Sequence, residues 1–441
     1  MIDFKPDKLG STNRRLQFSG STVRRDGRLI TTEELVSGTA LIAAALEPFR
    51  ARRVALLAHG ADQTLIALAA AEIAECQVLL CRTSELAEGL VQEWKPSALL
   101  DSSMSVRSTT VADADFPGFS VLIMSSGTTG VPKLAQHSID SLLGRIRPPK
   151  ANRPRQKWLL TYHPSTYGGL QVLLSALITG AELITASNPT VASLGEAALT
   201  YQPSHISGTP TFWRSFLLSL GPRASTLPLE QITLGGEIAD AHILKALRET
   251  YPAASISHIY ASTEAGALFS VRDGLPGFPA AWLQTGIDGI QLRIREGVLQ
   301  VKSPRGMKRY VARAASPVLT EDGWLISGDL VEQLGDRVYF SGRQDTMLNV
   351  GGSKVRPEEV EQVLFSFPEI ADARVYGVRN PITGVVLAAD IVPQAGQDVA
   401  NLKATLPANL RDRLEQYKVP RIFNFVSNIA VSEAGKKKKL A

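Results

Sequence analysis

A strand–helix–strand pattern in the first quarter of the chain limits the available folds most. An apolar run at residues 54–57 is followed by a helix-like stretch at 63–75 and by a second apolar run at 78–80. Parallel strands need a crossover connection, and a helix of this length is the usual one. Residues 158–187 repeat the pattern. We therefore predict an α/β fold in which layered parallel-type sheets are covered by helices.

The pattern changes after residue 343, and this change predicts a second domain. Beyond it, apolar residues recur at helical spacing at Val360, Val363, Leu364 and Phe367. Strand-like runs follow at 373–378, 385–392 and 421–426, with a second helix that ends near Tyr417. We expect a large N-terminal domain at residues 1–343, a hinge at 344–346 and a small mobile α+β domain at 347–441.

Composition and charge exclude several classes of protein. The chain has 441 residues, of which 44% are hydrophobic and 20% charged, so it can bury a large core. Its net charge is only +5, and lysines 436–439 alone supply four positive charges, so no nucleic acid partner is expected. No apolar run reaches the length of a membrane span, and the N-terminus lacks an apolar signal core. With Cys76 and Cys81 interpreted as buried free thiols, we expect a cytoplasmic protein.

A phosphate-binding loop is predicted at residues 125–133, with the sequence SSGTTGVPK. It follows the apolar run 121–124 and precedes a helix-like run from Ser138. Hydroxyl groups, glycines that let backbone N–H groups turn inward, and a lysine can surround a triphosphate ahead of a helix N-terminus. The loop lacks the spacing of a Walker motif. The expected nucleotide ligands are Ser125, Ser126, Gly127, Thr128, Thr129, Gly130 and Lys133.

A second polar cluster lies in the stretch 258–264, with the sequence HIYASTE. Tyr260 offers a ring that can stack on adenine, and Thr263 offers a hydroxyl for the α-phosphate. Glu264 offers the hard oxygen ligand that Mg²⁺ prefers. The cluster fits a site for ATP with Mg²⁺ held by Glu264; taken alone, it fits a strand end that runs into a polar turn equally well.

Together these stretches resemble the signature of the adenylate-forming superfamily, which includes acyl-CoA synthetases, adenylation domains and luciferases. Six signals stand in the family's order, from the phosphate loop to a lysine near the C-terminus. The remaining signals are Gly235-Gly236-Glu237, the stretch 258–264, Asp329 within 323–330, Arg343 with Asp345 at the start of 342–361, and Lys436 within 432–436. The resemblance implies an enzyme that uses ATP and Mg²⁺ to make an acyl-adenylate from a small carboxylic acid.

The resemblance also implies a role for each signal in the N-terminal domain. Gly235, Gly236 and Glu237 would form the turn beside adenine. Asp329 would accept hydrogen bonds from both ribose hydroxyls, which suits an ionised carboxylate. Arg343 would contact ribose or phosphate.

Three further roles belong to the hinge and the C-terminal domain. Asp345 would be the pivot of a domain rotation. Gly351 and Gly352 would line the tunnel for the incoming thiol after that rotation. Lys436 would bridge the substrate carboxylate and the α-phosphate, and so stabilise the charge that develops during attack.

The sequence departs from the family pattern in several places. His258 stands where the family has Asn, and Ala261 where it has Gly. Thr346 and Asn349 replace the commoner Asp and Lys, which leaves the pivot intact. The region before about residue 120 resembles the family only loosely, so an abbreviated first subdomain is expected.

The acid substrate is expected to be an acyl or aryl acid rather than an α-amino acid. Residues 162–165 occupy the position where amino-acid-activating relatives keep an aspartate, and they contain no carboxylate, so an ammonium group would go unpaired. The expected pocket residues are His163, Gly235, Ile259 and Ala261. His163 also fits a second interpretation, as a structural histidine packed by Tyr162 and Tyr167.

The acceptor stays open at this point. The leading hypothesis is an acid–thiol ligase that uses coenzyme A. The alternatives are an adenylation enzyme that loads the phosphopantetheine of an acyl carrier protein, an amide synthetase, and a non-catalytic nucleotide-binding descendant. Lys354, Arg356 and Arg421 are candidate partners for the phosphates of coenzyme A.

Overall fold

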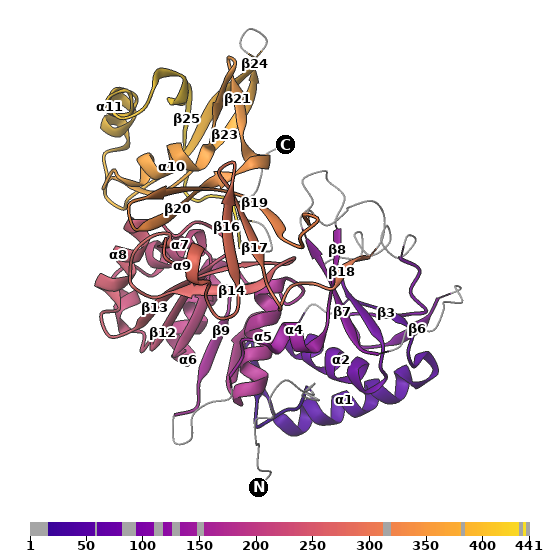
Figure 1. Cartoon of the computed structure of the whole chain (residues 1–441). Coiled ribbons are helices and arrows are strands. Elements are labelled where there is room, and N and C mark those ends of the chain that lie inside the picture. Colours follow the sequence, from indigo (N-terminus) through magenta and orange to yellow (C-terminus); the bar gives the residue numbers. More distant parts are fainter. Residues whose placement is uncertain are drawn as a thin grey trace.

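The computed structural model shows a large body and a smaller C-terminal unit that lies against one end of it (Figure 1). It describes residues 16–57, 60–81, 94–109, 118–125, 133–147, 154–311, 319–380, 384–431 and 435–437. The mixed sheets and covering helices confirm the predicted α/β class.

An eight-stranded sheet forms the first layer of the large body, in the order β14-β13-β12-β11-β9-β10-β1-β2. Neighbouring strands from β13 to β1 pair in parallel, and β14 and β2 add antiparallel edges. The strands are β1 (Thr22–Arg25), β2 (Arg28–Ile30), β9 (Lys157–Leu160), β10 (Glu182–Thr185), β11 (His205–Gly208), β12 (Gln231–Gly235), β13 (Ser255–Ser262) and β14 (Gly266–Val271). The helices between them are α5 (Tyr167–Thr179), α6 (Val191–Tyr201), α7 (Pro210–Leu220) and α8 (Ala241–Thr250), with a 3₁₀ turn at Gly221–Thr226.

A seven-stranded sheet forms the second layer, in the order β18-β8-β7-β4-β3-β5-β6. Its parallel pair β3 (Arg53–Leu56) and β4 (Gln77–Leu80) is joined by α2 (Ala61–Ile73), which confirms the strand–helix–strand prediction. The other elements are α1 (Thr32–Leu46), a 3₁₀ turn at Glu47–Phe49, β5 (Ala98–Leu100), β6 (Val106–Ser108), β7 (Ser120–Ser125), β8 (Lys133–His137), α4 (Ile139–Leu143) and β18 (Arg309–Val311). Helices α2 and α5 share one hydrophobic core with strands of both sheets.

One sequence expectation about the predicted phosphate loop is wrong. A helix does begin after Ser138, whose hydroxyl accepts the N–H of Ser141, but β8 lies between the loop and this helix. Strand β8 pairs antiparallel with β7, with Ser125 opposite Lys133. The helix therefore starts at the far end of β8, and a five-residue strand spans about 17 Å. The N-terminus of α4 cannot face phosphates bound at residues 125–133.

A five-stranded antiparallel sheet, in the order β15-β20-β19-β17-β16, lies between the first sheet and the C-terminal unit. Its elements are β15 (Phe278–Pro279), α9 (Trp282–Thr285), β16 (Gln291–Arg295), β17 (Val298–Lys302), β19 (Leu325–Leu334) and β20 (Arg337–Arg343). Gly277 begins this layer with φ +70°, and a Cβ there would lie 2.1 Å from the Val338 carbonyl oxygen. Only glycine fits, both for its backbone angle and for this close approach.

The C-terminal unit has its own hydrophobic core. After a 3₁₀ turn at Gln344–Thr346, it contains the hairpin β21 (Leu348–Val350) and β22 (Ser353–Val355), α10 (Pro357–Phe365), β23 (Ile370–Asn380), β24 (Gly384–Pro393), α11 (Val399–Arg411) and β25 (Ile422–Phe425). The second helix ends at Arg411 and not near Tyr417, because Gln416–Lys418 form a separate 3₁₀ turn. The remaining predicted elements of this region are present.

Two expectations drawn from the composition concern the cysteines and the length of the apolar helices. Cys76 and Cys81 are free and buried, and burial raises the pKa of their thiols to about 11 and about 12. Within the described residues, no helix is both long and apolar enough to cross a bilayer.

Candidate active site

Two of the predicted motifs meet at the carboxyl ends of neighbouring parallel strands. Gly235 ends β12 and lies beside Ile259 in β13. Thr209 follows β11, where it caps α7 by accepting the N–H of Phe212. Ligands of open α/β sheets bind at this edge, outside the carboxyl ends of the strands. The sheet therefore brings the Gly-Gly-Glu turn and the stretch 258–264 to one place.

Lys436 reaches this edge from the C-terminal unit. Gly236 has φ +84°, and a Cβ at that position would lie 3.1 Å from Cε of Lys436. The preceding residue, Gly435, accepts a hydrogen bond through its carbonyl from the Thr209 hydroxyl. The turn at Gly236 thus leaves room for the lysine, and the hydroxyl fixes the chain just before it.

The groups around Lys436 shift its pKa in opposite directions. Burial lowers its pKa, and the nearby Arg343 guanidinium acts in the same direction. The carboxylates of Glu237, Asp329 and Glu264 raise it, but they do not offset burial completely. Part of the residue is nevertheless exposed to solvent. A phosphate bound beside this lysine would raise its pKa further and so favour the charged form.

The predicted ribose ligand Asp329 is held from two sides. The Tyr260 hydroxyl donates to its Oδ2, and Nη1 of Arg343 donates to its Oδ1 over 2.8 Å. Nε of Arg343 also donates to Oδ1 of Asp345 over 3.0 Å. Burial raises the pKa of Asp329, and the Arg343 charge opposes that shift. A carboxylate has further lone pairs, so Asp329 can still accept hydrogen bonds from a ligand.

Tyr260, the predicted adenine-stacking residue, belongs to an aromatic cluster. Its ring centroid lies 4.9 Å from that of Phe340 and 5.3 Å from that of Phe269. Burial raises the pKa of its hydroxyl well above the ordinary tyrosine value, so the group acts as a donor to Asp329. Nearby, His258 lies in β13, and its Nε2 is 3.0 Å from the Leu275 carbonyl oxygen.

The predicted Mg²⁺ ligand Glu264 is oriented by a residue that the motifs did not identify. The Tyr310 hydroxyl donates to Oε1 of Glu264 over 2.8 Å, and Nζ of Lys133 lies 5.6 Å from the centre of the Tyr310 ring. Thr263 is fixed by His137, whose Nε2 lies 2.7 Å from the Thr263 carbonyl oxygen. Both supporting residues come from the β18–β8 pair, so this pair holds the turn that carries Thr263 and Glu264.

The structure describes the predicted phosphate loop only at its two ends. Residues 126–132, which include Ser126, Gly127, Thr128, Thr129 and Gly130, lie outside the described residues, as does the side chain of Ser125. The two ends of the loop are described, since Ser125 and Lys133 are paired between β7 and β8. The Lys133 end therefore lies close to Tyr310 and Glu264.

The predicted acid pocket contains an ordered histidine. The Ser165 N–H donates to Nδ1 of His163 over 3.2 Å, and the Thr166 hydroxyl caps α5 by accepting the N–H of Gly169. A Cβ on Gly169 would lie 2.1 Å from the His163 carbonyl oxygen, so this glycine allows the close turn. Ala261 follows Ile259 and Tyr260 on β13, at a register shift opposite β14. The imidazole thus has a fixed orientation at the start of α5.

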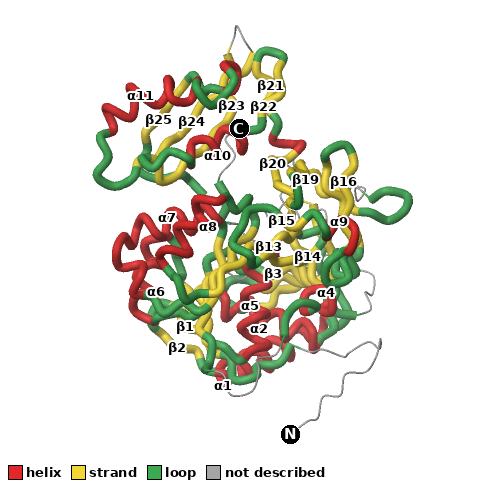
Figure 2. The backbone as a smooth tube through the Cα atoms, turned by 60° about the vertical axis from the view of Figure 1, so that its left-hand side comes forward, coloured by secondary structure: helices red, strands yellow, loops and turns green. Residues whose placement is uncertain are grey.

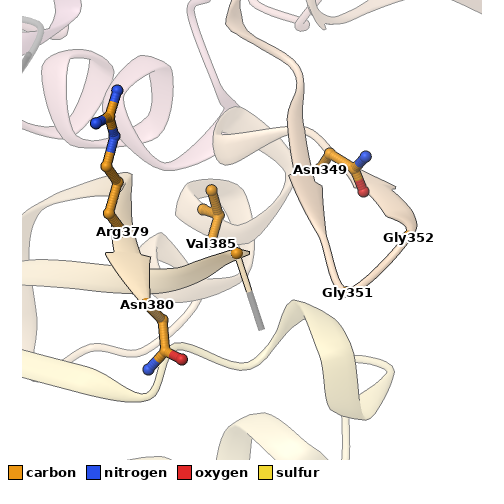
Figure 3. Close-up of a pocket in the computed structure, with 7 residues that line it drawn as sticks. Asn349, Gly351, Gly352, Arg379, Asn380 and Val385 are labelled. Carbon is orange, nitrogen blue, oxygen red and sulfur yellow. The ribbon is translucent and has the colours of Figure 1, made fainter. Parts of the chain in front are cut away.

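The predicted thiol-tunnel glycines form the turn of the β21–β22 hairpin. Gly351 and Gly352 have φ +58° and +90°, which matches the requirement of a tight two-residue hairpin. The hairpin borders an open pocket of about 690 Å³, which Figure 3 shows beside the ends of β23 and β24. The side chains of Arg379 and Asn380 extend to opposite sides of the strand end. The lining residues are Asn349, Gly351, Gly352, Arg379, Asn380, Gly384 and Val385.

Comparisons with known proteins define the class. Residues 23–310 match the family model of the AMP-binding enzymes, and residues 359–436 match that of the AMP-binding enzyme C-terminal domain. The chain belongs to the AMP-binding enzyme family, which confirms the resemblance to adenylate-forming enzymes.

Several curated relatives are aromatic acid ligases. The chain is 28% identical to benzoate–CoA ligase of Thauera aromatica, over 71% of this chain and 63% of the relative. It is 27% identical to 2-succinylbenzoate–CoA ligase of Bacillus licheniformis, over 71% and 68%. A match to naringenin synthase of Pestalotiopsis fici covers 54% of this chain but 9% of that protein. The chain thus spans less than two thirds of several curated relatives.

Solved structures with the same fold match nearly the whole chain. Anthranilate CoA ligase AuaEII in complex with anthranoyl-AMP gives a TM-score of 0.76 at 17% identity, over 96% of this chain and 93% of that one. The o-succinylbenzoate CoA synthetase MenE of Bacillus subtilis, bound to its acyl-adenylate, gives 0.70 at 21% identity, over 94% and 93%. These matches confirm the fold.

Proposed function

We propose that this protein uses ATP to convert an acyl or aryl carboxylic acid into an acyl-AMP, and then transfers the acyl group to the thiol of coenzyme A. The observation that carries the proposal is the position of Lys436. A lysine from the C-terminal unit lies among Glu237, Asp329 and Glu264 of the large body. Adenylation needs such a cation, because negative charge builds up where a carboxylate attacks a phosphate.

In the first half-reaction, a carboxylate oxygen of the acid attacks the α-phosphorus of ATP. The new bond is the acyl–phosphate C–O–P linkage, and the bond to pyrophosphate breaks. Lys436 bridges the two anionic reactants, while Asp329 holds the ribose hydroxyls and the Arg343 charge favours the ionised form of Asp329. Loop 125–133 and Lys133 bind the outgoing phosphates. Their task is to hold the reactants in line, which supplies much of the rate.

The donor set suits one Mg²⁺ ion shared with the nucleotide. Among the residues the structure describes, no group of three or more His, Cys, Asp or Glu side chains could hold a metal ion by itself. Among the described residues, only Oε1 of Glu264 takes a hydrogen bond, from Tyr310, so Oε2 is available to a metal ion. Mg²⁺ in nucleotide sites is typically held by one or two carboxylates together with phosphate oxygens. When bound, the ion would neutralise phosphate charge.

In the second half-reaction, the thiol sulfur attacks the acyl carbon, AMP leaves, and the thiol proton is lost to solvent. This step needs Lys436 to leave and an acceptor channel to arrive. We place the pivot at Asp345, between domains 1–343 and 347–441, and the channel at Gly351 and Gly352. A rotation of this kind separates the two steps in time.

The acid is proposed to be an acyl or aryl acid rather than an α-amino acid. Residues 162–165 offer His163 and Ser165 but no carboxylate for an ammonium group. The pocket wall is built from His163, Gly235, Ile259 and Ala261. The benzoate and 2-succinylbenzoate specificities of two relatives support aryl acids as the first group to test.

The direct test is acid-dependent exchange of radiolabelled pyrophosphate into ATP. We expect exchange with at least one member of a panel of benzoates, anthranilate and short acyl acids, and none without acid. Addition of coenzyme A, a phosphopantetheinyl carrier protein or an amine to the active mixture then names the acceptor. Absence of exchange across the whole panel would contradict the proposed activity, and transfer to the carrier or amine alone would replace coenzyme A.

The charge of Lys436 predicts an alkaline limit on adenylation. The surroundings of this lysine, with burial of its ammonium group as the main cause, lower its pKa, so the free enzyme loses the cation at a lower pH than a lysine in free solution would. The value of kcat/KM for exchange reports ionisations of the free enzyme. It should therefore fall as pH rises toward the ordinary lysine pKa. Lys436→Arg keeps its charge at high pH, so its residual activity should lack this decline.

A further inference from the structure

Lys437, the residue after the proposed catalytic lysine, has a binding pocket of its own in the C-terminal unit. Its Nζ lies 2.7 Å from Oε2 of Glu361 and 3.9 Å from Oδ1 of Asp372, and it donates to the Ala373 carbonyl. The ammonium group also lies 4.9 Å from the centre of the Phe365 ring. These groups come from α10 and from β23, which pack on each other.

The pocket is built around a positive charge. Side chains of Lys437, Glu361 and Asp372 are 15%, 14% and 4% exposed. Oδ2 of Asp372 has no hydrogen-bond partner among the described residues. The negative charge of this carboxylate is therefore compensated by nearby cations. Burial alone would lower the pKa of Lys437, but the carboxylates outweigh it and raise the pKa. Lys437 therefore stays charged in this pocket.

The backbone of Lys437 is tied to the other domain. Its N–H donates to Oε1 of Glu237 over 3.0 Å, and Oε2 of the same carboxylate accepts the N–H of Thr211 at the start of α7. On the next turn of α7, the Arg214 guanidinium carbon lies 3.9 Å from the centre of the Phe365 ring. Figure 2 shows α7 on the side of the large body that faces the C-terminal unit.

We infer that Lys437 is a positioning residue for adenylation: its side chain fastens residues 435–437 to the C-terminal unit while its N–H docks on Glu237, so that Lys436 is held at the Gly236 turn. The inference rests on the proposed function. The two successive lysines then have different roles: Lys436 binds the reactants, and Lys437 binds the acidic pocket of the C-terminal unit. The match to the C-terminal family model ends at residue 436, so Lys437 lies outside the stretch that it covers.

The chain offers a closely matched control for the loss of this ion pair. Nζ of Lys418 lies 2.7 Å from Oε1 of Glu359, and the lysine side chain is 17% exposed. Glu359 belongs to the same helix, α10, as Glu361. Lys418 and its partners Glu359 and Glu415 all lie in the C-terminal unit. Lys418→Met thus removes a similar bond in the same domain without touching the chain that carries Lys436.

The experiment compares Lys437→Met with Lys418→Met in both half-reactions. For Lys437→Met we expect pyrophosphate exchange to fall about 10²-fold, because a displacement of about 1 Å costs that much. Thioester formation from preformed acyl-AMP should stay near the wild-type rate, since Lys436 takes no part in it. Lys418→Met should keep both rates, and Lys437→Arg should recover part of the exchange.

A distance measurement gives a readout independent of activity. Spin labels on Lys245→Cys in α8 and Ala404→Cys in α11 report the separation of the two domains, and both positions are exposed. The native cysteines are buried, with pKa values raised to about 11 and about 12, so they should not take the label. In Lys437→Met the distance distribution should broaden, whereas Lys418→Met should match the wild-type distribution.

The outcomes separate this inference from the proposed activity. Equal losses in both half-reactions of Lys437→Met would show a structural role only and overturn the inference. Equal exchange in Lys437→Met and Lys418→Met would also overturn it. If the wild-type protein shows no exchange with any acid, the proposed activity fails. The spin-label distances then decide alone, and an unchanged distribution in Lys437→Met would overturn the positioning role.

Discussion

Lys436→Ala is expected to lower acid-dependent pyrophosphate exchange by about 10²–10³-fold, the usual effect of removing one preorganised group that stabilises developing charge. The side chain lies against the Gly236 turn, and no other C-terminal lysine among the described residues reaches that position. Thioester formation from preformed acyl-AMP should stay close to the wild-type rate. The measurement is exchange at saturating ATP, beside single-turnover thioester formation from the synthetic adenylate.

Lys403→Ala is the matched control for this variant. Lys403 lies on α11 of the same domain, is exposed, and has its ammonium group 5.6 Å from the Phe425 ring centre. Its removal changes the net charge equally but leaves the site untouched, so both rates should be retained. A parallel loss of both half-reactions in Lys436→Ala would mean that the lysine supports the fold or the nucleotide rather than the first chemical step.

Asp329→Ala is expected to impair both half-reactions, because AMP must stay bound through the ribose in each. Two hydrogen bonds to a charged acceptor contribute about 1.5–3 kcal/mol each, so kcat/KM for ATP should fall about 10²–10⁴-fold. The variant also leaves Arg343 and the Tyr260 hydroxyl without the partner that they share. Steady-state exchange at varied ATP, together with thioester formation from acyl-AMP, measures the effect.

Two further variants serve as controls for Asp329→Ala. Asp329→Asn keeps one acceptor oxygen and the shape of the side chain, so it should lie between wild type and Asp329→Ala. Asp322→Asn removes an exposed carboxylate paired with Arg293 over 2.7 Å in the same layer, and it should leave both half-reactions unchanged. If Asp329→Ala lost only exchange and retained thioester formation, Asp329 would not be the ribose ligand.

Local patterns in the sequence predicted the elements that have a local cause. The strand–helix–strand unit of β3, α2 and β4 was readable because its apolar runs have a strict order and spacing. Strand β8 was not readable, since four of its five residues are buried and show no alternation. Strand β1 was also missed, because it enters the first sheet through pairing with β10, about 160 residues away.

The residues of the candidate site also fall into two groups, those that a local motif indicates and those that only the tertiary fold brings together. Short motifs named Glu237, Asp329 and Lys436, since each stands in a recognisable order along the chain. The supporting contacts join distant residues with no local signal: His137 to Thr263 spans 126 positions, and Lys437 to Glu237 spans 200. Such residues acquire their role only from the tertiary fold, so no single stretch of sequence could reveal them.

The hydrogen bond from residue 437 to Glu237 is donated by a peptide N–H, and this has an evolutionary consequence. Every amino acid except proline presents the same group, so other substitutions at position 437 keep this donor even where they lose the ion pairs of the side chain. A changed side chain therefore loosens the attachment of residues 435–437 to the C-terminal unit without removing the hydrogen-bond donor to Glu237. Proline is the one substitution that would remove the donor itself.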